Sequence, residues 1–174
     1  AGPDGELVFD FNDFDETRDK TWLTNQISKK HRVGTYVLMI DGDEVLEPNG
    51  EKAIINTIAA NRNELAFRLR VLYLWDSRQQ IRVDGVYGRF SRPSLFRLIG
   101  NNSFGRTGVN GNLHCSCVPS LVRMNARHSQ VKLLHLGYMD KEDRIRKWKF
   151  YNGMDPVNAA EGYDAAHPER GSYP

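Results

Sequence analysis

The stretch Tyr36-Val37-Leu38-Met39-Ile40-Asp41-Gly42-Asp43-Glu44 decides the fold class that we expect. Its first five residues are apolar without alternation, which is typical of a strand buried on both faces in the middle of an α/β sheet. The run ends abruptly in three carboxylates, and ligands of open α/β sheets bind at the carboxyl ends of strands. The stretch therefore predicts a central strand that carries acidic side chains into a functional site.

Helices and strands alternate around this strand. Helices are expected from the carboxylates at Asp13 to Glu16 up to about Lys30, after Pro48, and from Asp140 to Gly153. The second of these helices has Ile54, Ile55 and Ile58 on one face. Further strands are expected at residues 7–9, 65–75, 94–99 and 131–136, and a loop at 101–112. The pattern predicts an α/β fold with a mixed sheet flanked by helices.

Length and composition describe one globular domain. The chain has 174 residues, of which 40% are hydrophobic and 26% charged. We expect a single domain over residues 1–174, with a frayed terminus at 1–5 and a loosely structured tail at about 155–174. The net charge of +2 excludes a chain-wide electrostatic field for nucleic acid as the main design.

The sequence also restricts the compartment that we expect. No apolar run approaches the roughly 20 residues of a membrane span, and no signal-peptide pattern opens the chain. The two cysteines, Cys115 and Cys117, cannot make a disulfide framework. A reducing, cytoplasmic location is therefore the expectation.

The acidic end of the strand is the first candidate site. Asp41, Asp43 and Glu44 would repel one another if they lay close together, so a cation is their natural neutraliser. Carboxylate oxygens favour Mg²⁺ or Mn²⁺, and such ions commonly bridge carboxylates to phosphates. His135, at the end of another strand, is a candidate third ligand. The plainer interpretations are a solvated acidic turn and a core histidine.

Basic residues gather in the helix that follows His135. They are Lys141, Arg144, Arg146, Lys147 and Lys149, and a solvated basic face explains most of them. Arg144 and Lys147 are three positions apart, so one helix face can direct both toward an anionic group.

Two further segments invite a chemical interpretation. His114, Cys115 and Cys117 suggest a zinc site. The spacing of the two cysteines is tighter than usual, however, and a fourth ligand such as His128 would be needed. Packing of both thiols as small apolar groups is therefore favoured. Asp84 lies near Trp75 and Tyr87, and aromatic rings beside polar groups suit a sugar or a base, with Asp84 as a general base. A surface hairpin with routine salt bridges is the simpler interpretation.

The order of these motifs resembles a known family. The run 36–46 looks like the metal-binding strand of family 2 glycosyltransferases of the GT-A fold, and Thr17-Arg18-Asp19 looks like the Arg-Asn pair that opens that family's preceding helix, with Asp19 in place of the Asn. Residues 82–98 and 113–147 are similar to the family's acceptor-side and final segments. The resemblance covers roughly residues 10 to 155.

The resemblance implies a metal-dependent, inverting transfer of a sugar from a nucleotide-sugar to an acceptor hydroxyl. Asp41, Asp43 and His135 would bind Mn²⁺ or Mg²⁺ against the diphosphate, and Asp84 would deprotonate the acceptor. Arg144 and Lys147 would contact the diphosphate and help it depart. The donor sugar, the nucleotide and the acceptor (a glycan, lipid, protein or modified nucleic acid) stay open.

The chain departs from the family at its beginning. Family members open with a βα unit that binds the nucleotide base, and that unit is not recognisable here. We therefore expect a partial or shortened GT-A-like sheet with an exposed edge, which would favour a homo-oligomer.

Two other functions are weighed against glycosyl transfer. One is a non-catalytic module that binds nucleic acid or protein through the basic helix near the C-terminus, with or without a zinc site. The other is a Mg²⁺-dependent phosphotransfer enzyme, which would need phosphate-cradling glycines of the P-loop kind that the sequence lacks.

Overall fold

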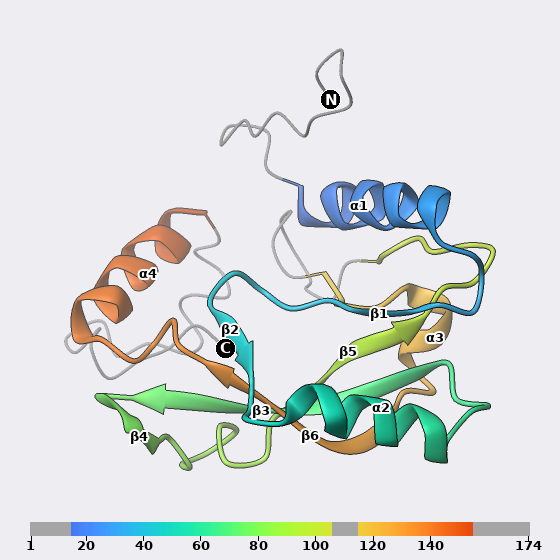
Figure 1. Ribbon diagram of the computed structural model, residues 1–174. Coiled ribbons are helices and arrows are strands. Elements are labelled where there is room, and N and C mark those ends of the chain that lie inside the picture. Colours follow the sequence, from blue (N-terminus) through green and yellow to red (C-terminus); the bar gives the residue numbers. More distant parts are fainter. Residues whose placement is uncertain (1–14, 106–114, 155–174) are drawn as a thin grey trace.

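A computed structural model describes residues 15–105 and 115–154 (Figure 1). Its helices are α1 (Glu16–Lys30), α2 (Gly50–Ala60), α3 (Ser120–Arg123) and α4 (Lys141–Met154). Its strands are β1 (Tyr36–Leu38), β2 (Glu44–Leu46), β3 (Ala66–Trp75), β4 (Ser77–Ile81), β5 (Ser91–Arg97) and β6 (Arg127–His135). The strand predicted at 7–9, the terminus at 1–5, the tail at 155–174 and most of the predicted loop at 101–112 lie outside the described residues.

The described strands form one mixed sheet, as the sequence predicts. The strand order is β1-β5-β3-β6-β2, and β4 pairs with β3 as a hairpin. β3 and β6 run parallel, whereas every other described pair is antiparallel. The fold class is therefore mixed α/β.

The central strand of the described sheet is β3, and the prediction that residues 36–40 form the middle strand is wrong. Among the described strands β1 pairs with β5 alone and stands at the end of the order. Its apolar run has another cause, because its two faces pack on different cores. Val37 and Met39 contact one core cluster, while Tyr36 and Leu38 contact the other. Residues apolar on both faces do not require a central position.

The two core clusters lie on opposite faces of the sheet. The first includes Ala66 and Phe96 and is covered by Ile27 of α1 and Val122 of α3. The second is formed by side chains that alternate with these along the strands: Phe67, Leu69, Leu95, Val131 and Leu133. Ala53, Ile54 and Ile58 of α2 pack against this second cluster. The sheet is thus a layer between α1 and α3 on one side and α2 on the other (Figure 1).

The helix boundaries follow local chemistry. α1 begins where the Asp15 carboxylate accepts a hydrogen bond of 3.0 Å from the Arg18 backbone N–H, as expected for an N-cap. α2 begins after Pro48, but Ile55, predicted on its apolar face, is 58% exposed. The sequence did not predict β2, β4 or α3, which are all short. None of the described helices has the length and apolar character needed to cross a membrane.

Candidate functional site

The acidic residues that follow β1 form a tight turn closed by backbone and side-chain bonds. The Glu44 backbone N–H donates to the Asp41 carbonyl at 3.0 Å, and the Asp41 backbone N–H donates to the Glu44 carboxylate at 3.0 Å. Glu44 is buried, with none of its side chain exposed, whereas the side chains of Asp41 and Asp43 are 40% and 32% exposed. The turn therefore directs one carboxylate inward and two toward the surface.

Arg92 neutralises two of these acids. Its guanidinium contacts the Asp41 carboxylate at 2.7 Å and the Glu44 carboxylate at 2.5 Å. Burial raises the pKa of Glu44, and Arg92 limits that rise. The pairing between β1 and β5 explains the contact, because Leu38 lies opposite Leu95 and the same register continued past the strand places Asp41 opposite Arg92. The sequence analysis assigned no role to Arg92.

Strand pairing also brings His135 to the turn. β2 runs antiparallel to β6 with Glu44 opposite His135, and the Leu136 backbone N–H donates to the Asp43 carbonyl at 2.8 Å. The His135 Nε2 atom lies 3.8 Å from a carboxylate oxygen of Asp43. The structure thus brings Asp43 and His135 together, as the sequence predicts.

The surroundings of His135 favour the neutral imidazole. The ring lies 4.9 Å from the Tyr73 ring and 5.0 Å from the Tyr138 ring, measured between centroids. Its Nδ1 atom is buried and has no hydrogen-bond partner in the described part of the chain. Burial lowers the pKa of His135 to about 4, with Lys147 and Arg92 acting in the same direction and Asp43 opposing them. At neutral pH the ring therefore has a lone pair available for a ligand.

Lys147 of α4 meets the same carboxylate. Its ammonium group forms an ion pair with the Asp43 oxygen that faces His135, although the two residues are 104 positions apart. Burial works to raise the pKa of Asp43, but the charge of His135 and the bond from Lys147 outweigh it and hold that pKa below its usual range. Because His135 is neutral at physiological pH, Lys147 is the group that neutralises the Asp43 carboxylate at that pH.

The separation of Asp43 and His135 is short enough for both to contact one divalent cation. Two donor atoms that each lie about 2.1 Å from one ion are at most about 4.2 Å apart, and the observed 3.8 Å satisfies that limit. Asp41 does not join them, since Arg92 holds its carboxylate. Across residues 15–105 and 115–154, no three His, Cys, Asp or Glu side chains are grouped so that they could hold a metal. Two protein ligands with phosphate oxygens completing the shell is a common arrangement for Mg²⁺.

Arg144 is directed into the protein. It is 4% exposed, and its guanidinium donates to the carbonyl oxygens of Tyr138 and Met139 at 2.8 and 3.0 Å and to the Asp76 carboxylate at 2.7 Å. It also lies 4.3 Å above the centre of the Trp75 ring. These contacts fix the connection between β6 and α4, and thereby the position from which Lys147 reaches Asp43. A diphosphate contact for Arg144 stays a prediction.

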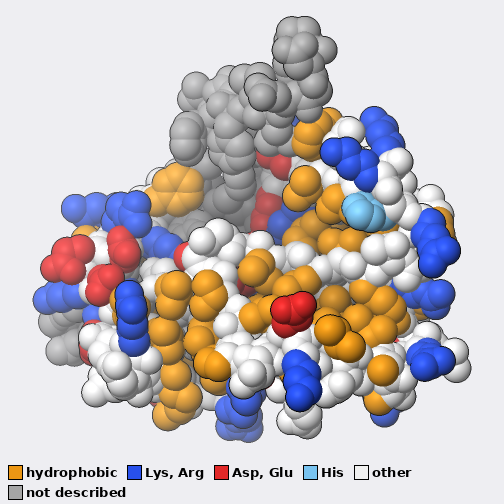
Figure 2. Space-filling view, in the orientation of Figure 1, with side chains coloured by type: hydrophobic (Ala, Val, Ile, Leu, Met, Phe, Trp, Pro, Cys, Tyr) orange, Lys and Arg blue, Asp and Glu red, His pale blue; other side chains and the backbone are white. Residues whose placement is uncertain are grey.

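The surface of α4 is not uniformly basic. Arg144 forms an ion pair with Asp76, and Lys147 forms one with Asp43. Arg146 pairs with Asp143 at 2.7 Å. Figure 2 shows acidic and basic side chains next to one another over this helix, and Lys and Arg side chains spread around the margin of the visible face. Much of the positive charge that the sequence predicts on this helix is therefore neutralised by acidic side chains of the protein itself.

Asp84 lies at the edge of an aromatic cluster that reaches His135. Its carboxylate accepts two bonds from Arg82, at 2.7 and 2.9 Å, and the Arg82 guanidinium is 4.5 Å from the Trp75 ring centre and 4.2 Å from that of Tyr87. Tyr87 in turn contacts Tyr73, the neighbour of His135, with a centroid distance of 5.0 Å. The hydrogen bonds from Arg82 lower the pKa of Asp84, which makes the carboxylate a weaker base.

The cysteines are packed into the first core cluster. Cys115 and Cys117 are buried and not in a disulfide, and Cys117 accepts a contact of 3.5 Å from the Lys20 ammonium. Burial raises the pKa of Cys115 to about 12, which opposes the thiolate that zinc requires. His114, the third residue of the zinc hypothesis, lies outside the described residues, and His128 is exposed on β6.

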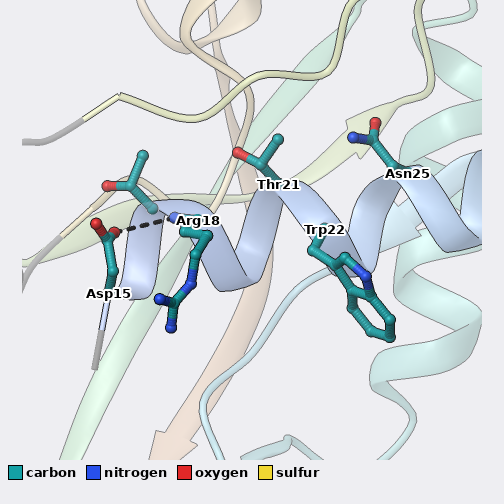
Figure 3. Close-up of a pocket in the computed structure, with 6 residues that line it drawn as sticks. Asp15, Arg18, Thr21, Trp22 and Asn25 are labelled. Carbon is teal, nitrogen blue, oxygen red and sulfur yellow. Dashed lines mark hydrogen bonds between the residues drawn. The ribbon is translucent and has the colours of Figure 1, made fainter. Parts of the chain in front are cut away.

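An open groove of about 440 Å³ runs along α1, away from the predicted site residues. The described residues that line it come from α1 and its N-cap: Asp15, Thr17, Arg18, Thr21, Trp22 and Asn25 (Figure 3). Asp41, Asp43, Asp84, His135, Arg144 and Lys147 are not among these lining residues. The groove and the acidic turn are therefore separate features.

The sequence matches no protein-family model and no curated protein. The site must accordingly be interpreted from its own chemistry.

Proposed function

We propose that this protein is a metal-dependent glycosyltransferase, or the part of one that holds the metal and the acceptor. The observation that supports the proposal best is the meeting of Asp43, His135 and Lys147 at one point. A carboxylate, a neutral imidazole and an ammonium group combine two ligands for a divalent ion such as Mn²⁺ with one donor for a phosphate. That combination suits a nucleoside diphosphate, which is the leaving group of sugar transfer.

The proposed roles follow from each side chain's surroundings. Asp43 and His135 would hold Mn²⁺ or Mg²⁺, which stabilises the negative charge that develops on the departing diphosphate. Lys147 would contact the diphosphate directly. Arg92 keeps the turn rigid through Asp41 and Glu44, so that Asp43 is presented in one orientation.

Asp84 is proposed as the residue that accepts the acceptor's proton. Arg82, which binds Asp84, lies over the Trp75 and Tyr87 rings, so a sugar ring would pack on these aromatic faces in place of the Arg82 guanidinium. Arg82 would have to release the carboxylate for it to act as a base. The GT-A-like fold, a cytoplasmic location and a homo-oligomer remain predictions.

Binding calorimetry with nucleoside diphosphates tests the proposal. We expect UDP, GDP or dTDP to bind in the presence of Mn²⁺ and at least about tenfold more weakly with a chelator, because phosphate binding is shared between the ion and Lys147. Asp43→Asn should remove the metal dependence, since an amide replaces the charged ligand. Asp140→Asn is the matched control, because Asp140 is exposed at the start of α4 and Asn caps a helix equally well.

The outcomes of this experiment separate the hypotheses. Metal-dependent binding in the unaltered protein and in Asp140→Asn, lost in Asp43→Asn, supports the proposal. The proposal is overturned if none of the three nucleotides binds in a metal-dependent way. Stoichiometric zinc in the purified protein would instead favour the zinc-containing binding module.

A further inference from the structure

The ion pair between Asp43 and Lys147 occupies the place proposed for a metal ion. The Lys147 ammonium lies on the Asp43 oxygen that is 3.8 Å from the His135 Nε2 atom. Both partners are sheltered, since the side chain of Lys147 is 20% exposed and that of Asp43 is 32% exposed. An ammonium group and a divalent ion cannot both occupy that oxygen at contact distance, because like charges repel.

The absence of a side chain at Gly137 leaves space for the contact between Asp43 and Lys147. A Cβ atom at this position would overlap both the Asp43 carboxylate and the Lys147 ammonium group. The backbone does not demand glycine here, because the described glycines with positive φ are Gly34 and Gly85. The missing side chain at Gly137 therefore serves the contact between Asp43 and Lys147.

We propose that Lys147 is a built-in cation that holds Asp43 when no metal is bound and moves to the diphosphate when a metal binds. This inference rests on the proposed function and adds a role for Lys147 in coupling the two ligands. The ammonium group has a second partner that keeps it nearby, because it lies 4.7 Å above the centre of the Tyr138 ring. Tyr138 lies beside His135, so the released ammonium stays next to the metal position.

The proposal has two opposite consequences for binding. Lys147 competes with a metal ion for Asp43, so it weakens the binding of metal alone. A metal ion that displaces Lys147 frees the ammonium for phosphate, so metal and phosphate strengthen each other's binding by the same factor. Removing the ammonium should therefore improve one affinity and reduce the other, which a purely structural salt bridge would not do.

Calorimetry with Mn²⁺ alone, with inorganic pyrophosphate alone, and with pyrophosphate in the presence of Mn²⁺ tests the inference. In Lys147→Met we expect Mn²⁺ to bind about tenfold more tightly, since a competing charge is gone, and pyrophosphate to bind about tenfold more weakly. The coupling between the two ligands should shrink in this variant. Lys149→Met is the matched control, because Lys149 is exposed on the same helix and its loss changes the net charge equally. Lys147→Gln repeats the comparison with a polar side chain.

The results distinguish this inference from the function on which it rests. Unchanged or weaker Mn²⁺ binding in Lys147→Met and Lys147→Gln, with metal-dependent nucleotide binding intact in the unaltered protein, overturns the inference alone. Equal tightening in Lys149→Met also overturns it, because the effect would then come from net charge. Failure of every form to bind Mn²⁺ overturns the inference and the proposed metal site together.

Discussion

The buried imidazole of His135 should make the protein lose stability in mild acid. Its pKa is lowered from 6.5 to about 4, first by burial and then by the cations Lys147 and Arg92. Desolvation gives the physical reason, since the charged ring would lie against the Tyr73 and Tyr138 rings instead of in water. We expect the substitution His135→Gln to remove this pH dependence.

The size and sign of the effect follow from proton linkage. Between pH 6.5 and about 4 the unfolded chain binds a proton at His135 that the folded protein does not bind. Stability from this residue is thus fully present above pH 6.5 and is lost as the pH falls through that window. The two pKa values differ by about 2.5, and one pKa unit corresponds to about 1.4 kcal/mol, so the full loss is about 3.5 kcal/mol, of which about 3 kcal/mol falls between pH 7 and pH 4.

Urea denaturation followed by tryptophan fluorescence measures this loss. The free energy of unfolding is determined between pH 7 and pH 4, with a chelator present so that metal binding does not contribute. The unaltered protein should lose about 3 kcal/mol more than His135→Gln over this range. His128→Gln should behave like the unaltered protein, because His128 is exposed on the same strand. Equal slopes for the unaltered protein and His135→Gln would refute the reasoning.

Two further predictions, one on a substitution and one on chemical modification, test other parts of the structure. Arg92→Met should cost about 3–5 kcal/mol of unfolding free energy, because Glu44 then stays buried without a counter-ion. Adding Glu44→Gln to this variant should recover most of the loss, and urea denaturation of both forms measures it. A double variant that stays as unstable as Arg92→Met would count against the ion pair. Cys115 and Cys117 should resist iodoacetamide at pH 8 until the protein is unfolded, since both are buried and burial raises the pKa of Cys115 to about 12. Rapid labelling of the folded protein, followed by mass spectrometry, would contradict that packing.

Local chemistry made part of the fold predictable. Acidic residues before α1 and the proline before α2 mark helix starts that depend on adjacent residues only, and both were found in the structure. Strand β3 was also predicted closely, because Phe67, Leu69 and Val71 alternate with Arg68 and Arg70 in the sequence. The position of β1 was not predictable in this way. A run that is apolar on both faces shows that both faces are covered, but strand order depends on distant partners.

The same distinction applies to the candidate site, where some residues could be predicted from the local sequence and others depend on distant pairing. Asp43 and His135 could be proposed from the sequence because each follows an apolar strand, and the structure brings them together. Arg92 could not, since its contact with Asp41 depends on the pairing of β5 with β1. The inward direction of Arg144 likewise depends on Asp76, which is 68 residues away along the chain. Helical spacing predicted that Arg144 and Lys147 share a side, but not that protein groups would already engage both.

A crystal structure of the protein soaked with Mn²⁺ and a nucleoside diphosphate tests the central claim most directly. The anomalous signal of manganese locates the ion independently of the surrounding protein. We expect one manganese bound by Asp43 and His135, with the diphosphate on its open side and the Lys147 ammonium moved from Asp43 to a phosphate oxygen. Manganese bound at another place, or a diphosphate bound away from the acidic turn while Lys147 still holds Asp43, would contradict the account.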